Sequence, residues 1–461
     1  MDHKDTIAAI ATAVSSSGIG IIRVSGEDAC VVAEKIFRKA RNKKLDISIN
    51  DCDHKVIYGH IYDGDKMVDE VLMLVMKGPH SYTGEDTVEI DCHGGVLIMR
   101  RILEIVIKYG ARPAEPGEFT KRAFLNGRID LSQAEAVMDV ISAKNQYALK
   151  CSMNQLKGKV SEKIRELREE IIYEIAFIES ALDDPEHISL DGYPDKLKKK
   201  LEPMIREIKK LIDSSDNGRV MKEGVKTVIL GKPNVGKSSL MNVLSGQERA
   251  IVTDIAGTTR DILEEHIQLE GISLNVVDTA GIRETKDVVE QIGVSRAKDA
   301  ARDADLIIYV VDASVPLDDN DENIIEMIES QRAIVLLNKS DLKTVVTTQE
   351  LGKRTGKKVI AVSAKEETGM EELEKTVKDM FYEGKIDFND EIYITNVRHK
   401  TALTESCTSL MMVMESIDLG MPEDFYSIDL MNAYKQLGSI IGEAVEDDLV
   451  NEIFSRFCMG K

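Results

Sequence analysis

The sequence predicts a multidomain α/β and all-α fold, in which an α+β domain comes first and an α/β domain interrupts a helical domain. Three observations predict this fold class. The chain has 461 residues, enough for about three domains of ordinary size. Apolar residues make up 43% of it, a share typical of globular proteins. Their spacing changes along the chain from mixed periods to helical steps, then to alternating strands and helices, and back to helical steps.

Residues 1–120 predict a domain of mixed strands and helices. The strand candidates, rich in β-branched residues, are residues 19–24, 56–62, 67–76 and 87–92. Only the turn Asp63-Gly64-Asp65 separates the second from the third, so we expect these two to pair. The fourth leads through His93-Gly94-Gly95 into an amphipathic segment that ends at Gly110, as expected of a helix.

Residues 121–222 and 385–461 predict helices, because their apolar residues recur at steps of three and four. The longest run is Val160, Ile164, Leu167, Ile171, Ile175, Ile178 and Leu182. Shorter runs are Leu201, Ile205, Ile208 and Ile212, then Leu403, Cys407, Leu410 and Met414, and finally Leu449, Ile453 and Phe457. We expect the two segments to form one helical domain.

Residues 223–384 alternate strands with helices, the pattern of a parallel sheet. The strand candidates are residues 227–230, 274–277, 306–311, 333–337 and 359–362. Directly after the first strand stands Gly231-Lys232-Pro233-Asn234-Val235-Gly236-Lys237-Ser238. It fits the phosphate-binding loop G-x-x-x-x-G-K-[ST], whose glycines let backbone N–H groups turn toward phosphate oxygens. We expect Lys237 to reach the β- and γ-phosphates and Ser238 to supply a magnesium ligand.

Three further segments of this unit indicate a guanine nucleotide. Asp278-Thr279-Ala280-Gly281 follows a strand, where an acidic residue meets Mg²⁺ and a glycine amide senses the γ-phosphate. In Asn338-Lys339-Ser340-Asp341, the carboxylate of Asp341 can accept two hydrogen bonds that guanine offers and adenine does not. Ser363-Ala364-Lys365 resembles the loop that supports the guanine carbonyl. The four segments together predict a Ras-like P-loop GTPase domain.

The catalytic detail differs from the Ras pattern. Ras-like enzymes place a water-orienting glutamine where this chain has Ile282. Glu284 and Glu290 are the nearby carboxylates that could orient water, and the alternative is that both are solvated surface charges. The first switch belongs at Gly257-Thr258-Thr259-Arg260-Asp261. Before it, Thr253-Asp254-Ile255-Ala256 offers oxygen donors that suit a hard monovalent cation, whose charge would replace an arginine finger.

The acidic composition bears on partners and location. The net charge is −21, so the chain repels a phosphate backbone on average. Its six cysteines are scattered without a C-x-x-C pair, as in reduced cytosolic proteins. No apolar run approaches the roughly 20 residues of a membrane span, and the start Met1-Asp2-His3-Lys4-Asp5 is unlike a signal peptide. We expect a cytoplasmic protein with no membrane segment.

At this point the chain resembles the tRNA modification GTPase family of the MnmE (TrmE) type, from end to end. The first signature is the GTPase set with Gly-Thr-Thr-Arg-Asp and a hydrophobic residue after Asp-Thr-Ala-Gly. The second is a pair of N-terminal segments, residues 78–86 (GPHSYTGED) and 112–120 (RPAEPGEFT). The third is the terminus Phe457-Cys458-Met459-Gly460-Lys461.

The resemblance implies an activity and its cofactors. Such proteins bind GTP with Mg²⁺ and hydrolyse it, with stimulation by K⁺ and by dimerisation of the G domains. In a heterotetramer with a flavoprotein partner, MnmG (also called GidA), they add a carboxymethylaminomethyl or aminomethyl group at C5 of the wobble uridine of certain tRNAs. The one-carbon unit comes from 5,10-methylene-tetrahydrofolate, of which 5-formyl-tetrahydrofolate is an analogue, and FAD is bound only by the partner. Because this chain is so acidic, we expect tRNA to bind mainly through that partner.

The resemblance also implies a domain plan. Residues 1–120 would bind tetrahydrofolate and dimerise the protein into a homodimer. Residues 121–222 and 385–461 would form the helical domain, which ends in the Cys-x-Gly-Lys motif, and residues 223–384 the inserted G domain.

The family's site residues carry over to positions of this chain. The potassium ligands would be Asn234, Thr253, Ile255 and Thr258, and the magnesium ligands Ser238 and Thr259. The GTP-binding residues would be Asn234, Val235, Gly236, Lys237, Ser238, Ser239, Thr253, Asp254, Ile255, Ala256, Gly257, Thr258, Thr259, Asp278, Thr279, Ala280, Gly281, Asn338, Lys339, Asp341, Ser363, Ala364 and Lys365. The folate contacts would be Arg23, Glu89, Arg128 and Lys461. The family often has lysine where Arg128 stands, which keeps the charge but changes the geometry.

Two residues would be catalytic. Glu290 falls on the family's catalytic acidic residue in the second switch. Cys458 faces the folate site in the family, where a thiolate would attack uridine C6 or assist one-carbon transfer. The alternative for Cys458 is a buried small hydrophobe at the end of a helix face.

Two other functions compete with this one. A ribosome-assembly GTPase of the Era or EngA class would need a KH domain or a second set of nucleotide motifs, and the sequence shows neither. A folate-dependent aminomethyltransferase with a regulatory GTPase insertion would fit a degenerate nucleotide site, whereas all four guanine-binding segments look intact.

Overall fold

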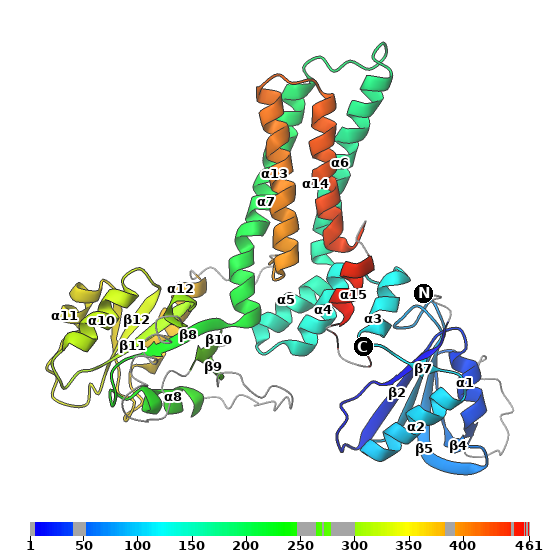
Figure 1. The fold of residues 1–461 in the computed structure, drawn as a ribbon, viewed down its shortest axis with the longest axis horizontal. Helices are drawn as coiled ribbons and strands as arrows, with labels where there is room; N and C mark the ends of the chain where they lie inside the picture. The colour runs from blue at the N-terminus through cyan, green and yellow to red at the C-terminus, as the bar shows by residue number, and fades with distance from the viewer. Residues whose placement is uncertain are drawn as a thin grey trace. The chain divides into compact units, whose positions relative to one another are not determined.

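The computed structural model describes residues 5–39, 52–246, 264–269, 272–277, 300–382, 392–443, 447–455, 457 and 460. The chain divides into two compact units, each assembled from segments that are distant in sequence (Figure 1). The first unit comprises Met1–Met138, Gln155–Lys198 and Thr408–Lys461. The second comprises Asp139–Asn154 and Lys199–Cys407. Mixed sheets and long helices confirm the predicted fold class.

The first unit contains a seven-stranded sheet in the order β3-β4-β5-β6-β2-β1-β7. Its strands are β1 (Ile7–Ile10), β2 (Ile19–Ser25), β3 (Phe37–Lys39), β4 (Lys55–Asp63), β5 (Lys66–Met76), β6 (Thr87–His93) and β7 (Arg112–Pro113). All neighbours are antiparallel except β1 and β7. The four predicted strands are confirmed, as is the predicted hairpin of β4 and β5.

Two helices, α1 (Ala29–Ile36) and α2 (Val96–Lys108), cover one face of this sheet. They pack against fully buried strand residues such as Ile22 and Ile90. Successive strand side chains point to opposite faces, so Arg23 and Glu89, which adjoin Ile22 and Ile90, lie on the other face. The sheet therefore separates an apolar core from an open face that carries the charged pair Arg23 and Glu89 beside exposed apolar residues such as Ile19 and Leu72.

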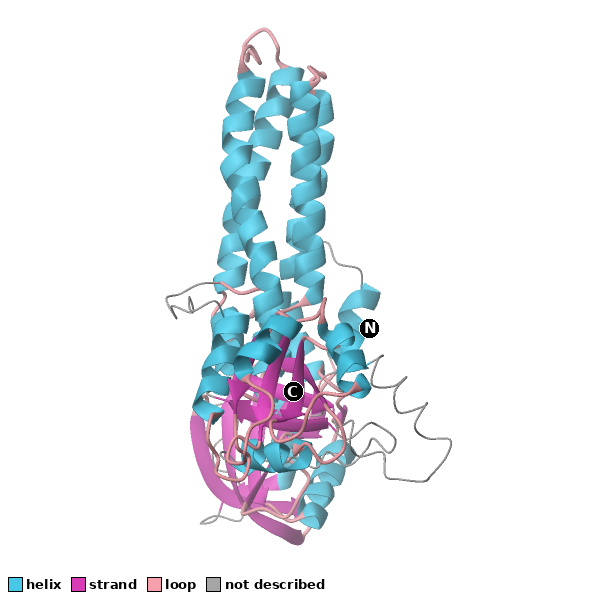
Figure 2. Ribbon diagram, turned by 90° about the vertical axis from the view of Figure 1, so that its left-hand side faces the viewer, coloured by secondary structure: helices cyan, strands magenta, loops and turns pink. Residues whose placement is uncertain are grey.

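The helical segments contain the predicted long helix. It is α6 (Lys159–Asp183), and its predicted apolar face is buried, Ile171 and Ile178 completely, except at its end, where Leu182 is 43% exposed. α6 runs side by side with α14 (Asp424–Ile441), as Figure 1 shows. Figure 2 shows the helices in cyan and the strands in magenta. The other helices here are α3 (Glu118–Leu125), α4 (Leu131–Ser142), α5 (Gln146–Leu156), α7 (Tyr193–Glu223), α13 (Val397–Asp418) and α15 (Asp447–Ser455).

One helix boundary corrects the sequence prediction. Phe457 was expected on the apolar face of the last helix, but α15 ends at Ser455. The backbone N–H of Phe457 instead donates to the carbonyl of Phe454 in a tight turn. The rings of Phe454 and Phe457 lie 5.1 Å apart, centroid to centroid, and both are buried. Phe457 therefore keeps its apolar packing without belonging to the helix.

The second unit contains a six-stranded sheet in the order β13-β12-β11-β8-β10-β9. Its strands are β8 (Val225–Leu230), β9 (Glu264–Leu269), β10 (Ile272–Val277), β11 (Leu306–Asp312), β12 (Ala333–Asn338) and β13 (Lys358–Ala361). All pairs are parallel except β9 with β10. The five predicted strands are confirmed, and the edge strand β9 was not predicted.

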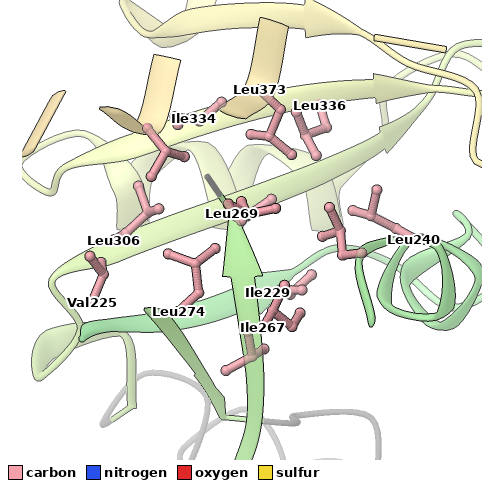
Figure 3. Close-up of a cluster of buried hydrophobic side chains, with 14 of the residues drawn as sticks. Val225, Ile229, Leu240, Ile267, Leu269, Leu274, Leu306, Ile334, Leu336 and Leu373 are labelled. Atoms are coloured by element: carbon pink, nitrogen blue, oxygen red, sulfur yellow. The ribbon is translucent and has the colours of Figure 1, made fainter. Parts of the chain in front are cut away.

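Helices pack onto this sheet through two apolar cores, one on each face. They are α8 (Lys237–Gly246), α10 (Asp319–Ile328), α11 (Thr348–Thr355) and α12 (Met370–Tyr382). Figure 3 shows Leu240 of α8 and Leu373 of α12 pointing toward strand residues such as Ile229 and Leu336. This core fixes the strand ends, where the loops of the candidate site begin. Within the parts of the chain that the structure describes, no helix combines the length and apolarity needed to span a bilayer.

Candidate functional site

The phosphate-binding loop joins β8 to α8, as its sequence motif requires. Gly231 has a φ of 149° and Gly236 a φ of 100°, which L side chains rarely adopt. A Cβ on Gly231 would lie 2.5 Å from the carbonyl oxygen of Val310, and a Cβ on Gly236 would collide with the amide of Asn338. Both glycines are therefore needed for the loop to close against its neighbours.

The ammonium group of Lys237 is hydrogen-bonded to the backbone of the phosphate loop. Its Nζ donates to the carbonyl oxygens of Gly231 and Lys232, each at 2.7 Å. As the first residue of α8, it stands where backbone N–H groups of the helix terminus also favour an anion. The exposed side chains of Asn234, Ser238 and Ser239 border the same loop.

The loop after β12 is tied to the phosphate loop. Asn338 is 2% exposed; its Nδ2 donates to the carbonyl of Val235 at 2.8 Å, and its Oδ1 accepts the N–H of Ala364 at 3.1 Å. Lys339 donates to the carbonyl of Asn234 at 3.0 Å and to Asp312 at 2.5 Å. Burial alone would raise the pKa of Asp312, but hydrogen bonds from Lys339 and Ser314 lower it, so the carboxylate stays charged.

Asp341 is held in a fixed orientation beside this junction. Ser363 is buried, and its hydroxyl donates to Asp341 Oδ1 at 2.7 Å. Asp341 itself is exposed, so its other carboxylate oxygen is available to a ligand. The structure thus brings together the three predicted segments at residues 231–239, 338–341 and 363–365.

A further group at this site was missed at the sequence level. Lys232 Nζ pairs with Asp321 Oδ2 at 2.6 Å and with Asp318 Oδ2 at 2.9 Å. Burial alone would lower the pKa of Lys232, but the two carboxylates raise it. The sequence does place Asp318 three residues before Asp321, a spacing typical of a capping box at the start of a helix. The structure has this capping box, at the start of α10.

The candidate folate residues meet on the open face of the first sheet. Arg23 of β2 and Glu89 of β6 are direct cross-strand partners, and Arg23 Nε lies 2.7 Å from Glu89 Oε1. Arg23 Nη1 also donates to the carbonyl of Gly460 at 3.2 Å. Gly460 has a φ of 88°, and a Cβ there would lie 2.5 Å from the carbonyl of Ile10. The last turn of the chain is therefore seated against β1.

Tyr82 lies at the centre of the candidate folate residues that the structure describes. The guanidinium carbons of Arg23 and Arg128 lie 5.2 and 5.0 Å from its ring centroid, and Arg128 donates to its carbonyl at 3.0 Å. The hydroxyl of Tyr82 lies 2.9 Å from that of Thr120. Phe119 adds a second ring, 5.6 Å from the Arg23 guanidinium. Sequence reasoning had not singled out Tyr82 or Phe119, although both stand in the two N-terminal signature segments.

A buried ion network fixes the segment that carries Tyr82. Arg122 is 3% exposed and pairs with Glu85 at 3.2 Å and with Glu118 at 3.0 Å. Burial alone would raise the pKa of Glu118, but hydrogen bonds from Arg112, the Glu115 backbone and Arg122 lower it. The Glu118 carboxylate therefore stays charged, and the pairing of Arg122 with Glu85 holds the loop before β6 to α3.

Several predicted site residues lie outside the described residues, and their placement stays a prediction. They are Thr253, Asp254, Ile255, Ala256, Gly257, Thr258, Thr259, Asp278, Thr279, Ala280, Gly281, Glu290, Cys458 and Lys461.

Comparisons with known proteins find matches along the chain. Residues 131–458 match the family described as the MnmE helical domain, and residues 6–128 match the GTP-binding protein TrmE N-terminus. The chain is also similar to the G domain of the T. maritima FeoB iron transporter, with 29% identity over 34% of this chain and 97% of that one, at a TM-score of 0.27.

Full-length relatives decide the family. The tRNA modification GTPase MnmE of Lachnoclostridium phytofermentans is 57% identical over 99% of both chains. Proteins of the same name from Clostridioides difficile and Acetivibrio thermocellus are 48% and 47% identical, over 99% and 100% of both chains. The chain therefore belongs to the MnmE family of tRNA modification GTPases.

Proposed function

We propose that this protein is a potassium-stimulated GTP hydrolase that acts in the modification of tRNA wobble uridines. The observation that supports it best is the junction of Asn338, Asp341 and Ser363 with the phosphate loop. A buried amide ties the loops together, and a hydroxyl orients the carboxylate that selects guanine. A site for adenine would not need that carboxylate, because adenine lacks the paired N–H donors.

The described residues account for GTP binding. Lys237 and the N–H groups at the start of α8 would hold the β- and γ-phosphates, and Asp341 would accept hydrogen bonds from the guanine edge. The exposed hydroxyl of Ser238 and the exposed amide of Asn234 are oxygen donors, which suit Mg²⁺ and K⁺ respectively. When bound, these cations would offset the charge that develops on the phosphates. We propose Thr253, Ile255, Thr258 and Thr259 as the remaining cation ligands and Glu290 as the residue that orients water.

We propose that the N-terminal group binds a tetrahydrofolate one-carbon donor. Glu89 is a carboxylate that can accept N–H hydrogen bonds from a pterin ring, and Tyr82 and Phe119 offer rings against which it can stack. Arg128, which donates to the carbonyl of Tyr82, would also pair with a carboxylate of the folate tail. Lys461 would add a second cation, because Gly460 is already seated beside Arg23. Cys458, two residues earlier, is our candidate for nucleophile or one-carbon transfer residue.

Partners complete the proposed function. A flavoprotein of the MnmG type, carrying FAD, would supply the redox step and most of the tRNA-binding surface, since this chain carries a net charge of −21. We also propose a homodimer formed through the N-terminal sheet. Its face opposite α1 and α2 exposes Ile19 at 63%, Tyr58 at 52% and Leu72 at 43%, an apolar surface that a second copy would cover.

The experiment that tests the proposed function is a deletion in the natural host, followed by mass spectrometry of tRNA nucleosides. Loss of the modified wobble uridine, restored by the wild-type gene and not by a D341N variant, is the expected result. An unchanged modification profile in the deletion strain would refute the proposed role in tRNA.

A further inference from the structure

Lys232 occupies the phosphate loop without facing the phosphates. Its side chain is 17% exposed and its Nζ lies between the carboxylates of Asp321, at 2.6 Å, and Asp318, at 2.9 Å. Two carboxylates neutralise its charge, so Lys232 adds little to the field that attracts a nucleotide. The contacts of Lys232 instead hold the phosphate loop to α10.

Asp321 is a buried carboxylate whose oxygens are both engaged. Its side chain is 2% exposed, and it is the third residue of α10. Oδ1 accepts from the hydroxyl of Tyr309 at 2.8 Å; Oδ2 accepts from Lys232 and from the N–H of Asp318 at 3.0 Å. Tyr309 is itself fully buried in β11, at the centre of the sheet. The carboxylate is therefore fixed relative to the rigid part of the domain.

Lys232 in turn contacts Lys237, the lysine expected to bind the phosphates. The carbonyl oxygen of Lys232 accepts from Lys237 Nζ at 2.7 Å. A shift of the Lys232 backbone would therefore move a carbonyl acceptor that holds Lys237 in place. The second acceptor is the carbonyl of Gly231, the preceding residue in the loop.

We propose that Tyr309, Asp321 and Lys232 form a brace that positions Lys237 for the phosphates of the nucleotide. This inference rests on the proposed GTP site and adds positioning residues to it. The brace acts on binding, since both GDP and GTP carry the β-phosphate that Lys237 meets. Removing the charge of Lys232 leaves the buried Asp321 carboxylate without its cation, and removing the charge of Asp321 leaves Lys232 held by Asp318 alone. In either case the loop is freer to move away from its binding geometry.

The test measures the dissociation constants of GTP and GDP for the full-length protein and for K232M, D321N and K232M/D321N. Because each variant loses a charged hydrogen bond, we expect it to raise the dissociation constants of both GTP and GDP by at least about tenfold. Because the two side chains act as one unit, the double variant should be within about twofold of the weaker single variant. The KM for GTP should rise in parallel while kcat stays within about twofold of wild type.

A matched control separates this effect from general damage. Lys357 also donates to two oxygens, the carbonyls of Glu329 and Gln331, each at 2.8 Å, but it lies in the loop between α11 and β13. K357M should lower stability without changing nucleotide affinity. Should D321N fail to fold, D318N serves in its place, because asparagine caps a helix as well as aspartate while losing the charge that faces Lys232.

Three results would overturn the brace. The first is that the variants bind GTP as tightly as wild type. The second is that the loss of binding free energy in the double variant equals the sum of the two single losses, and the third is a fall in kcat at unchanged KM. Failure of the wild-type protein to bind GTP at all would instead refute the proposed function.

Discussion

At the residue scale, we propose that Asp341, which the hydroxyl of Ser363 orients, selects the base. We predict that D341N moves the preference of the protein from GTP to xanthosine triphosphate. The 2-oxygen of xanthine accepts a hydrogen bond from an amide, whereas the 2-amino group of guanine needs an acceptor. Competition binding with the two triphosphates measures the change.

The S363A variant is the control for this exchange. It removes the hydrogen bond that orients Asp341 but keeps the carboxylate, so GTP should bind more weakly and still be preferred. Undiminished preference for GTP in D341N would show that another residue reads the base.

His93 provides a second residue-scale prediction, on pH. Its Nδ1 lies 2.7 Å from Asp69 Oδ1, and the hydrogen bond and charge of Asp69 raise the pKa of His93 above 6.5. A raised pKa in the folded state means that the pair stabilises the fold fully below about pH 6.5. The contribution is lost as the pH rises through the folded-state pKa.

NMR titration of the His93 ring measures this pKa directly. The value should lie above 6.5 in the wild-type protein and fall in D69N. A wild-type value at or below 6.5 would mean that the pair does not form in solution.

At the scale of single elements, the end of α14 makes a prediction about packing. Gly442 caps this helix with a φ of 89°, and a Cβ there would lie 2.7 Å from the ring of Phe124 and 2.9 Å from Leu131 Cβ. Gly420 also has a positive φ, 64°, but nothing lies within 4 Å of its Cβ position. Both alanine variants bear a backbone strain of about 1–2 kcal/mol. Only G442A also forces α14 away from α3 and α4.

Hydrogen exchange of the α14 peptides distinguishes the two variants. Amides of α14 should exchange clearly faster in G442A than in G420A, because the loss of packing is local to the helix. Equal exchange in both variants would contradict the close approach of Phe124 to this helix end.

The elements also show what the sequence could predict. Strongly periodic segments such as α6 and buried strands such as β11 were predicted, because burial on one or both faces imposes an apolar pattern. β9 was missed because only Ile267 and Leu269 interrupt its polar sequence, as is common for an edge strand. The end of α15 was misplaced because Phe457 continues the apolar pattern while the backbone turns.

The candidate site was predictable where a motif fixes residue spacing. Lys237, Asp341 and Ser363 belong to such motifs, and the structure brings their segments together. Tyr82 and Asp321 were not identified, because they act through partners far away in sequence. Tyr82 meets Arg23 across the fold, and Asp321 meets Lys232 in the same way. Contacts of this kind depend on the tertiary structure, and no spacing of residues in the sequence predicts which two of them meet.

At the scale of the whole molecule, the net charge of −21 governs contact with tRNA. We predict that this chain alone binds tRNA weakly at physiological salt and that the proposed flavoprotein partner supplies most of the affinity. Release of counterions from the phosphates requires basic groups, of which this chain has an overall deficit. Filter binding at several salt concentrations, with and without the partner, checks this. Tight binding by the chain alone at physiological salt would contradict it.

We propose that this molecule is a guanine-specific hydrolase whose catalytic charge comes in part from an alkali metal ion. Turnover of GTP by the full-length protein in KCl, compared with NaCl at equal ionic strength, tests it most directly. We predict turnover at least about tenfold faster with potassium, since positive charge at the transferring phosphate strongly accelerates this chemistry, and no comparable turnover of ATP. Equal rates in the two salts, or ATP consumed as readily as GTP, would contradict the account.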